Sequence, residues 1–228
     1  MKAFTSSALL LLVAGLFAGV PAQQINSAYR FIDESQAAGL WAGYMLADRG
    51  DAGFGPKSGP VFGGRYSIRV SGPFQIEVEG AYIPATRAVL DTAVVDSMYE
   101  RVGEADMNMA LLNGSLRFNL TGARTWHNLQ PFFAFGAGAV LDLSGENGAD
   151  ADVPADARFD LGTRFAGQLG GGIEWFATRQ LTVRLDARNV LWKISTPDPF
   201  LLGRLGEETV ADEWLQNGMF SLGLSLRF

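Results

Sequence analysis

The chain has 228 residues, a formal net charge of −6 and no cysteine. Its length accommodates one sizeable domain or two small ones. The negative charge argues against a nucleic-acid-binding protein, because such proteins present a dense positive field to their ligand. The lack of cysteine excludes disulfides, thiolate metal sites and cysteine nucleophiles from this chain.

The first 22 residues have the pattern of a secretory signal peptide. Lys2 precedes an unbroken apolar run at 8–20, and the segment ends in small residues at Ala22. The run is shorter than the roughly 20 residues that a helix needs to cross a bilayer, and no longer apolar stretch follows it. We therefore predict cleavage after Ala22. The polar, poorly periodic segment 23–38 then forms a periplasmic lead-in, with a short helix at the mouth of the following domain.

From Gly39 onward, apolar and polar residues alternate with period two in eight segments separated by turn residues. The segments are 39–48, 61–71, 74–83, 106–120, 130–143, 161–176, 181–194 and 218–228. No helical period of comparable length follows the signal segment. The pattern predicts an all-β domain over 39–228.

The connections between these segments alternate in length. The short ones are 72–73, 121–129 and 177–180, and the long ones are 49–60, 84–105, 144–160 and 195–217. Short turns at one end and long loops at the other are typical of outer-membrane barrels, whose turns are periplasmic. We predict an eight-stranded antiparallel up-and-down transmembrane β-barrel with four extracellular loops and both termini in the periplasm.

The charged residues indicate which face of the strands meets lipid. After the signal segment there are two lysines, Lys57 and Lys193, against fifteen arginines. Arginine is favoured over lysine in packed, multiply hydrogen-bonded ion pairs. The polar face carries Arg65, Arg69, Glu77, Glu79, Arg117, Asp142, Arg164, Glu174, Arg184, Asp186, Arg188 and Arg227. The apolar face carries the aromatic residues Tyr66, Phe74, Tyr82, Phe118, Trp175, Phe220 and Phe228.

These two faces predict an apolar exterior with interfacial aromatic residues and a narrow, charged lumen. The alternative is a soluble barrel with an aromatic core, which the signal segment and the loop asymmetry disfavour. An eight-stranded barrel has an interior just wide enough for its own side chains. We therefore predict a structural Arg/carboxylate network that plugs the lumen, formed by Arg65, Arg69, Glu77, Glu79, Arg117, Glu174, Arg184, Asp186, Arg188 and Arg227.

The C-terminal segment alternates strictly, with Phe220, Leu222, Leu224, Leu226 and Phe228 on one face. This pattern, the hairpin sequence at 170–176 and 185–188, and the eight strands together resemble the outer-membrane barrels typified by OmpA and OmpX. The resemblance implies a Gram-negative outer membrane. Lipid and lipopolysaccharide would surround the protein, and the barrel-assembly machinery would read the five alternating residues. No peptidoglycan-binding domain is expected after Phe228, so cell-wall tethering is not implied.

Some barrels of this size modify lipid A, which raises the question of catalysis. Acyl transfer would need a nucleophile and a base near the outer rim. The chain has a single histidine, His127, which the predicted topology places beside Trp126 in a periplasmic turn. We expect it to anchor that turn at the membrane interface, and we predict no catalytic residue and no cofactor.

Two further patterns are weak as sites. Asp150 and Asp152 offer the oxygen ligands that calcium prefers, but the segment lacks the rest of an EF-hand loop and contains Pro154. We predict a solvated acidic loop and no metal site. The glycine runs 136–138 and 170–172 precede no helix, so they are not phosphate-binding loops. They permit close packing in strands.

The sequence thus favours a non-enzymatic barrel with a structural or surface-interaction role and an extracellular partner that no motif identifies. A small pore, or a transport conduit for small solutes, is the alternative. An apolar lumen would favour a conduit for apolar solutes, whereas the polar face of this chain is charged. A lipid-modifying enzyme comes third.

Overall fold

A computed structural model describes residues 27–95, 98–145, 148–150, 153–201 and 211–228. The predicted signal segment lies outside these residues, and its cleavage stays a prediction. None of the helices in the described ranges is long and apolar enough to cross a membrane. They are three single-turn 3₁₀ segments, η1 (Gly148–Asp150), η2 (Ala155–Ala157) and η3 (Asp198–Phe200).

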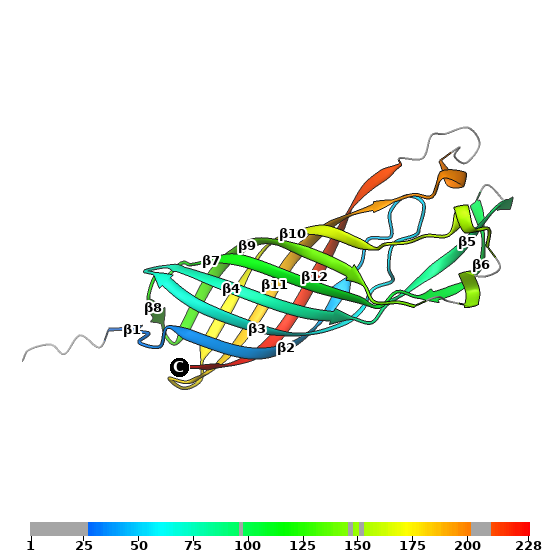
Figure 1. Cartoon of the computed structure of the whole chain (residues 1–228). Coiled ribbons are helices and arrows are strands. Elements are labelled where there is room, and N and C mark those ends of the chain that lie inside the picture. The colour runs from blue at the N-terminus through cyan, green and yellow to red at the C-terminus, as the bar shows by residue number, and fades with distance from the viewer. Residues whose placement is uncertain (1–26, 96–97, 146–147, 151–152, 202–210) are drawn as a thin grey trace, which may run out of the picture.

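Eight long strands form a closed antiparallel barrel in which each strand pairs with its neighbours along the chain (Figure 1). They are β2 (Gln36–Leu46), β3 (Gly59–Ser71), β4 (Phe74–Ile83), β7 (Met109–Asn119), β9 (Leu129–Asp142), β10 (Thr163–Phe176), β11 (Leu181–Ser195) and β12 (Asp212–Arg227). Pairing of β12 with β2 closes the barrel. The predicted up-and-down barrel is confirmed.

The alternation of short and long connections is also confirmed. The turns and the C-terminus lie at one end of the barrel, and the long connections lie at the other (Figure 1). We call these the turn end and the loop end. In the β3–β4 turn, Gly72 has a φ of 48°, a conformation that glycine adopts without strain. The predicted strand 74–83 coincides with β4.

Two predicted loops contain strands. The segment predicted as loop 84–105 forms a separate hairpin of β5 (Thr86–Val95) and β6 (Met98–Asp106). The second is the last long loop, because β12 begins at Asp212, where the sequence predicted 218. Its first residues continue the pairing with β11 as far as Ser195. This extension includes polar residues outside the apolar band, so the period-two pattern of the sequence did not reveal it.

The lead-in forms a strand and a strap, so the predicted short helix is wrong. β1 (Tyr29–Phe31) pairs with β8 (Arg124–Trp126), a short strand within the predicted turn 121–129. The next residues cross the barrel mouth, and β2 begins at Gln36. We call residues 29–35 the mouth strap. Its backbone carbonyls accept hydrogen bonds from the barrel wall, which holds an extended chain in place without a helix.

The outer surface of the strands is apolar. All seven aromatic residues predicted for the lipid-facing side are exposed, as are outward-pointing leucines such as Leu40 and Leu224. Tyr66 donates its hydroxyl hydrogen to the side-chain oxygen of Gln36 near the turn end. Charged side chains of the strands point mainly inward, which is the arrangement of a membrane barrel.

The interior has two layers. A polar layer lies toward the turn end and is described below. Toward the loop end, the inward side chains are apolar and fully buried, among them Met45, Trp192 and Leu215. Phenylalanines from three loops join the same cluster, with Phe54 4.9 Å from Phe200 and 5.4 Å from Phe159 between ring centroids. We call these three aromatic side chains the loop cap.

Candidate functional site in the barrel lumen

The polar layer is a single connected set of ion pairs. Of the ten residues predicted to plug the lumen, the structure brings nine together, each with a side chain no more than 6% exposed. We call this set the lumen network. Its members are Arg65, Glu77, Glu79, Arg117, Glu174, Arg184, Asp186, Arg188 and Arg227.

Glu77 of β4 joins one side of the network to the other. Its Oε1 lies 2.5 Å from Nη1 of Arg184 and 3.3 Å from Nη1 of Arg117, on strands β11 and β7. Its Oε2 lies 4.0 Å from Nε of Arg65. Because its partners come from three strands, this carboxylate connects distant parts of the barrel wall across the lumen.

Asp186 and Glu79 form a second group of contacts. The Oδ1 atom of Asp186 lies 2.9 Å from Nη2 of Arg184, and its Oδ2 atom lies 3.3 Å from Arg65 and 3.4 Å from Arg188. Glu79 lies 2.6 Å from Nη2 of Arg65 and also pairs with Arg188. Arg184 and Arg188 thus contact two carboxylates each, and Arg65 contacts three.

Glu174 completes the network toward the turn end. Its Oε2 lies 2.6 Å from Nη2 of Arg117, and its Oε1 lies 3.3 Å from Nη1 of Arg227. Six of the eight barrel strands therefore supply charged members. Five arginines meet four carboxylates, which gives the network a formal charge of +1.

Inward aromatic rings, which the sequence interpretation missed, contact all five arginines. The guanidinium carbons of Arg117 and Arg184 lie 3.9 and 4.1 Å from the ring centroid of Phe132. Trp41 lies beside Arg65 and Arg188, at 5.9 and 5.4 Å, and Phe176 lies 5.0 Å from Arg227. A cation over a ring face is attracted by the ring quadrupole, which helps to offset the surplus positive charge. The period-two phase of β2, β9 and β10 could have identified these rings as inward-facing.

Little space remains between these side chains. The cavity bounded by Glu77, Phe132, Arg184, Asp186 and Arg188, among others, has a volume of about 10 Å³. That volume is about the minimum for one water molecule.

Glycines of the predicted glycine runs make this packing feasible. A Cβ atom at Gly170 would lie 2.6 Å from Cα of Arg188, and one at Gly172 would lie 2.8 Å from Cζ of Phe132. Such separations are far below van der Waals contact. The glycines leave room for the arginines and the ring, in agreement with the predicted packing role.

The tenth predicted residue, Arg69, lies at the mouth and not in the network. Its Nη1 donates to the carbonyl oxygen of Ile32 at 2.6 Å, and its Nη2 donates to that of Glu34 at 2.7 Å. Arg227 also donates to the Glu34 carbonyl oxygen, at 3.3 Å. Ile32 is buried. The prediction that Arg69 belongs to the lumen network is therefore wrong, because carbonyl oxygens of the mouth strap, for which the sequence predicted a short helix, accept its hydrogen bonds.

Two further members of the predicted polar face lie near the loop end. Arg164 donates from Nε to the carbonyl oxygen of Leu161 at 2.8 Å, and Asp142 accepts from the backbone of Ser144 at 2.7 Å. Both contacts are local. They fix the ends of β9 and β10 and add no charge to the lumen network.

His127 lies in the tight β8–β9 turn at the turn end, with a φ of 49°. Its ring meets the ring of Trp126 edge-on at 4.8 Å. Asp150 pairs with Arg87 at 2.7 Å, and Asp152 lies outside the described residues. In the described part of the chain, no three histidine or acidic residues cluster closely enough to hold a metal ion.

The residues of the predicted assembly signal stand on the outer face of β12. Phe220, Leu222, Leu224 and Leu226 are exposed, and Phe228 exchanges two backbone hydrogen bonds with Gln36, of 3.0 and 3.1 Å. The C-terminus therefore helps to close the barrel. Recognition by the assembly machinery stays a prediction.

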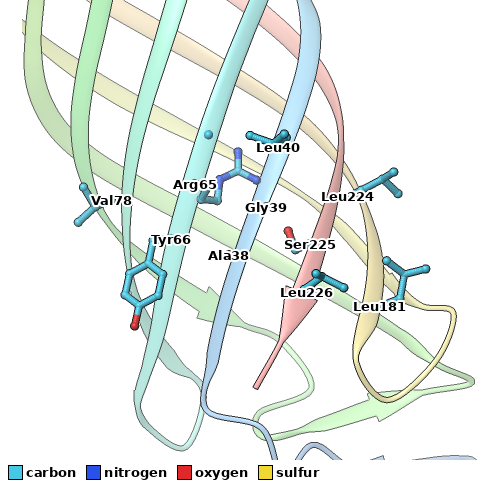
Figure 2. A pocket seen from close by; sticks show the side chains of 11 residues that line it. Ala38, Gly39, Leu40, Arg65, Tyr66, Val78, Leu181, Leu224, Ser225 and Leu226 are labelled. Carbon is cyan, nitrogen blue, oxygen red and sulfur yellow. The ribbon is translucent and has the colours of Figure 1, made fainter.

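An apolar groove of about 730 Å³ runs along the outer wall near the turn end. Figure 2 shows Leu40, Tyr66 and Leu226 around it, pointing away from the strands that carry them. Small residues, Ala38 and Gly64, form its floor. The groove belongs to the lipid-facing surface.

A closed barrel with an apolar exterior and buried charges inside it is the architecture of an integral outer-membrane protein. The sequence matches the outer membrane protein beta-barrel domain family over residues 8–228. The chain belongs to this family of Gram-negative outer-membrane barrels, which confirms the resemblance seen in the sequence.

Several solved outer-membrane proteins are similar to this chain. The outer membrane protein OprG from Pseudomonas aeruginosa is 12% identical, with a TM-score of 0.50, and the match covers 86% of this chain and 97% of OprG. Neisserial surface protein A is 11% identical over 89% of this chain and 98% of its own, with a TM-score of 0.48. Outer membrane protein W of E. coli is 12% identical over 86% and 98%, with a TM-score of 0.43. Among curated proteins, none matches this chain in sequence.

Proposed function

We propose that this protein is a closed, non-enzymatic outer-membrane barrel with a structural or surface-interaction role. Its turn end and both termini face the periplasm, and its four loops face outward. The observation that carries the proposal is the lumen network, in which the cavity beside Glu77, Arg184, Asp186 and Arg188 has a volume of about 10 Å³. Hydrated ions need a continuous wider path, so the barrel conducts none.

Contacts at both ends support a closed state. The mouth strap crosses the turn end and is hydrogen-bonded to Arg69 and Arg227. The loop cap joins the apolar layer beneath it at the loop end. A barrel that is blocked at three levels presents its loops to partners without passing solutes. The partners expected in the membrane are its lipid and lipopolysaccharide and, during biogenesis, the barrel-assembly machinery.

Catalysis on lipid is disfavoured by the place of His127. The turn end, where it lies, faces the periplasm under the proposed orientation, so the ring is remote from the outer rim where lipid A would be met. The ring also lies against Trp126 in a strained turn, an arrangement that suits an anchor at the interface.

Planar-bilayer recording tests the plug. The unmodified protein should show no steady conductance. Glu77→Ala combined with Arg184→Ala removes a paired anion and cation together, and it should open measurable conductance. The matched control is Lys193→Gln with Asp212→Asn, which removes an exposed pair at the loop end and should leave the barrel silent. Steady, ion-selective conductance in the unmodified protein would refute the plugged lumen and favour the alternative that the protein is a small pore.

A second candidate, a conduit for apolar solutes, is favoured by one observation. The loop-end layer is apolar and includes four buried methionines, Met45, Met107, Met109 and Met219. Methionine adapts its shape to varied apolar partners. A brominated alkane offered to the protein in vesicles should quench Trp192 strongly if it enters this layer. Under the closed-barrel proposal, quenching is confined to exposed tryptophans such as Trp214, and replacing Trp192 with phenylalanine leaves it unchanged.

A further inference from the structure

A pocket of about 430 Å³ lies at the turn end, apart from the lumen network. Three segments that are distant in the sequence form its walls: residues 30–34 of the mouth strap, β8 with the turn that follows it, and the β10–β11 turn. Phe176 separates this pocket from the network, because its ring lines the pocket and also contacts Arg227. The sequence interpretation assigned no role to any of these segments beyond that of a lead-in and turns.

The pocket carries balanced charge. Arg30 and Arg179 line it together with Asp33 and Glu34. No side chain of these four forms an ion pair with another described residue, although every arginine of the lumen network is paired. Two cations and two anions within one pocket complement a ligand that itself bears both charges.

A buried hydroxyl points to the same conclusion. Thr125 lines the pocket and is 3% exposed, and its Oγ1 atom has no hydrogen-bond partner among the described residues. Burying a hydroxyl without a partner is unfavourable. A ligand oxygen in the pocket would satisfy it.

The surroundings place the pocket at a membrane interface. Tyr29 and Trp126 lie opposite each other in the β1–β8 pairing, and both are about half exposed. Phe31 is 68% exposed, with the guanidinium of Arg124 over its ring at 4.3 Å. Exposed aromatic side chains of this kind collect at the level of lipid headgroups.

We propose that this pocket binds the phosphoethanolamine headgroup of a glycerophospholipid. Arg30 and Arg179 hold the phosphate through charge-assisted hydrogen bonds, and the Thr125 hydroxyl donates to one of its oxygens. Asp33 and Glu34 accept from the ammonium group. A simple anion would leave these carboxylates facing like charge, and a phosphocholine ammonium has no N–H to donate. This proposal does not depend on whether the barrel is plugged.

Native mass spectrometry tests the proposal on the full barrel equilibrated with equal amounts of phosphatidylethanolamine, phosphatidylcholine and phosphatidylglycerol. The unmodified protein should retain phosphatidylethanolamine about tenfold more than the other two lipids, the effect of one charge-assisted hydrogen bond. Arg30→Gln combined with Arg179→Gln should abolish the preference. The control Arg101→Gln, at an exposed site on the β5–β6 hairpin, should keep it.

Thr125→Val separates binding from folding. Its unpartnered hydroxyl does not stabilise the lipid-free protein, so denaturant unfolding in a phosphocholine detergent should show equal or slightly greater stability. Retention of phosphatidylethanolamine should fall several-fold. If stability falls while retention stays unchanged, the residue is structural and the proposal fails.

Soluble probes separate the membrane lipid from other sources of the same chemistry. Glycerophosphoethanolamine should compete weakly with the lipid, and inorganic phosphate should not compete. The proposal is overturned if phosphate competes as well as the soluble headgroup, if the three lipids are retained equally, or if phosphatidylglycerol is preferred. It is also overturned if a zwitterionic cell-wall peptide displaces the lipid at lower concentration than the soluble headgroup does.

Discussion

Replacing Asp186 with asparagine removes one negative charge from the lumen network while nearly preserving shape. Asp186 contacts Arg184 at 2.9 Å, Arg65 at 3.3 Å and Arg188 at 3.4 Å. The network carries a formal charge of +1, so the substitution raises it to +2. Arg184→Met, by contrast, lowers it to zero. We therefore expect the loss of the carboxylate to be the more damaging of the two changes.

The expected magnitudes follow from burial. Breaking a buried ion pair by removing one partner typically costs about 3–5 kcal/mol. All three arginines around Asp186 retain another carboxylate partner, so Asp186→Asn should lower the free energy of unfolding by about 3 kcal/mol, the low end of that range. Arg184→Met should lower the free energy of unfolding by about 2 kcal/mol, because Glu77 still pairs with Arg117 after the substitution. The double variant restores the network charge of +1 and should lower the free energy of unfolding by about 3 kcal/mol. This is about 2 kcal/mol less than the sum of the two single effects, which is the coupling energy between Asp186 and Arg184.

Urea unfolding from lipid vesicles, followed by tryptophan fluorescence and by the gel mobility shift of the folded barrel, measures these values. The Lys193→Gln and Asp212→Asn variants form the matched cycle, because that pair is exposed and should couple by less than about 1 kcal/mol. The reasoning is refuted if the lumen cycle is additive within about 0.5 kcal/mol. It is equally refuted if Arg184→Met destabilises the protein more than Asp186→Asn.

Three other predictions concern topology, assembly and packing. Protease added to intact cells should cut within 84–105 and should not cut within 121–129. Cleavage within 121–129 while the outer membrane is intact would contradict the proposed orientation. Deleting Phe228 should impair membrane insertion in cells more than refolding in detergent, and the reverse outcome would argue against an assembly signal. Gly170→Ala should lower the free energy of unfolding by about 1–3 kcal/mol through overpacking, whereas Gly114→Ala, where a Cβ meets nothing within 4 Å, should not. Equal effects in denaturant unfolding would contradict the close packing at Gly170.

The strands were predictable because a membrane barrel repeats one signal eight times. Period-two alternation locates the β4 strand to the residue, since Gly72 and Pro73 bound it on one side. The signal weakens where a strand leaves the lipid band. The first two residues of β12, Asp212 and Glu213, are polar and still pair with β11, and the β5–β6 hairpin forms a separate sheet outside the barrel wall. In those places backbone hydrogen bonds and a few buried apolar side chains, such as Leu215 and Val89, maintain the strands, and period-two alternation does not reveal them.

The site was predictable in its membership but not in its surroundings. Charged residues of one phase must share the lumen, which identifies nine of the ten residues named from the sequence. The partner of Arg69 could not be predicted, because the mouth strap has no long period-two pattern and contacts Arg69 through its backbone carbonyl oxygens. The rings beside the arginines were missed for another reason. Trp41 and Phe132 are apolar residues in the inward phase, and apolar residues in a membrane barrel are readily assigned to lipid.

The two interior layers differ in what they specify. Lipid is as apolar as the loop-end layer, so the hydrophobic effect does not distinguish inward from outward for residues such as Met45 or Leu215. The lumen network does distinguish them. A slip of one residue in strand register turns every side chain to the other face. Exposing an arginine to lipid costs about 2–4 kcal/mol at the bilayer midplane and less near the interface, so turning Arg184 and Arg188 of β11 toward lipid costs at most roughly 4–8 kcal/mol. Even a part of that penalty is a large fraction of the stability of a typical domain. The charged layer therefore selects the register of the barrel.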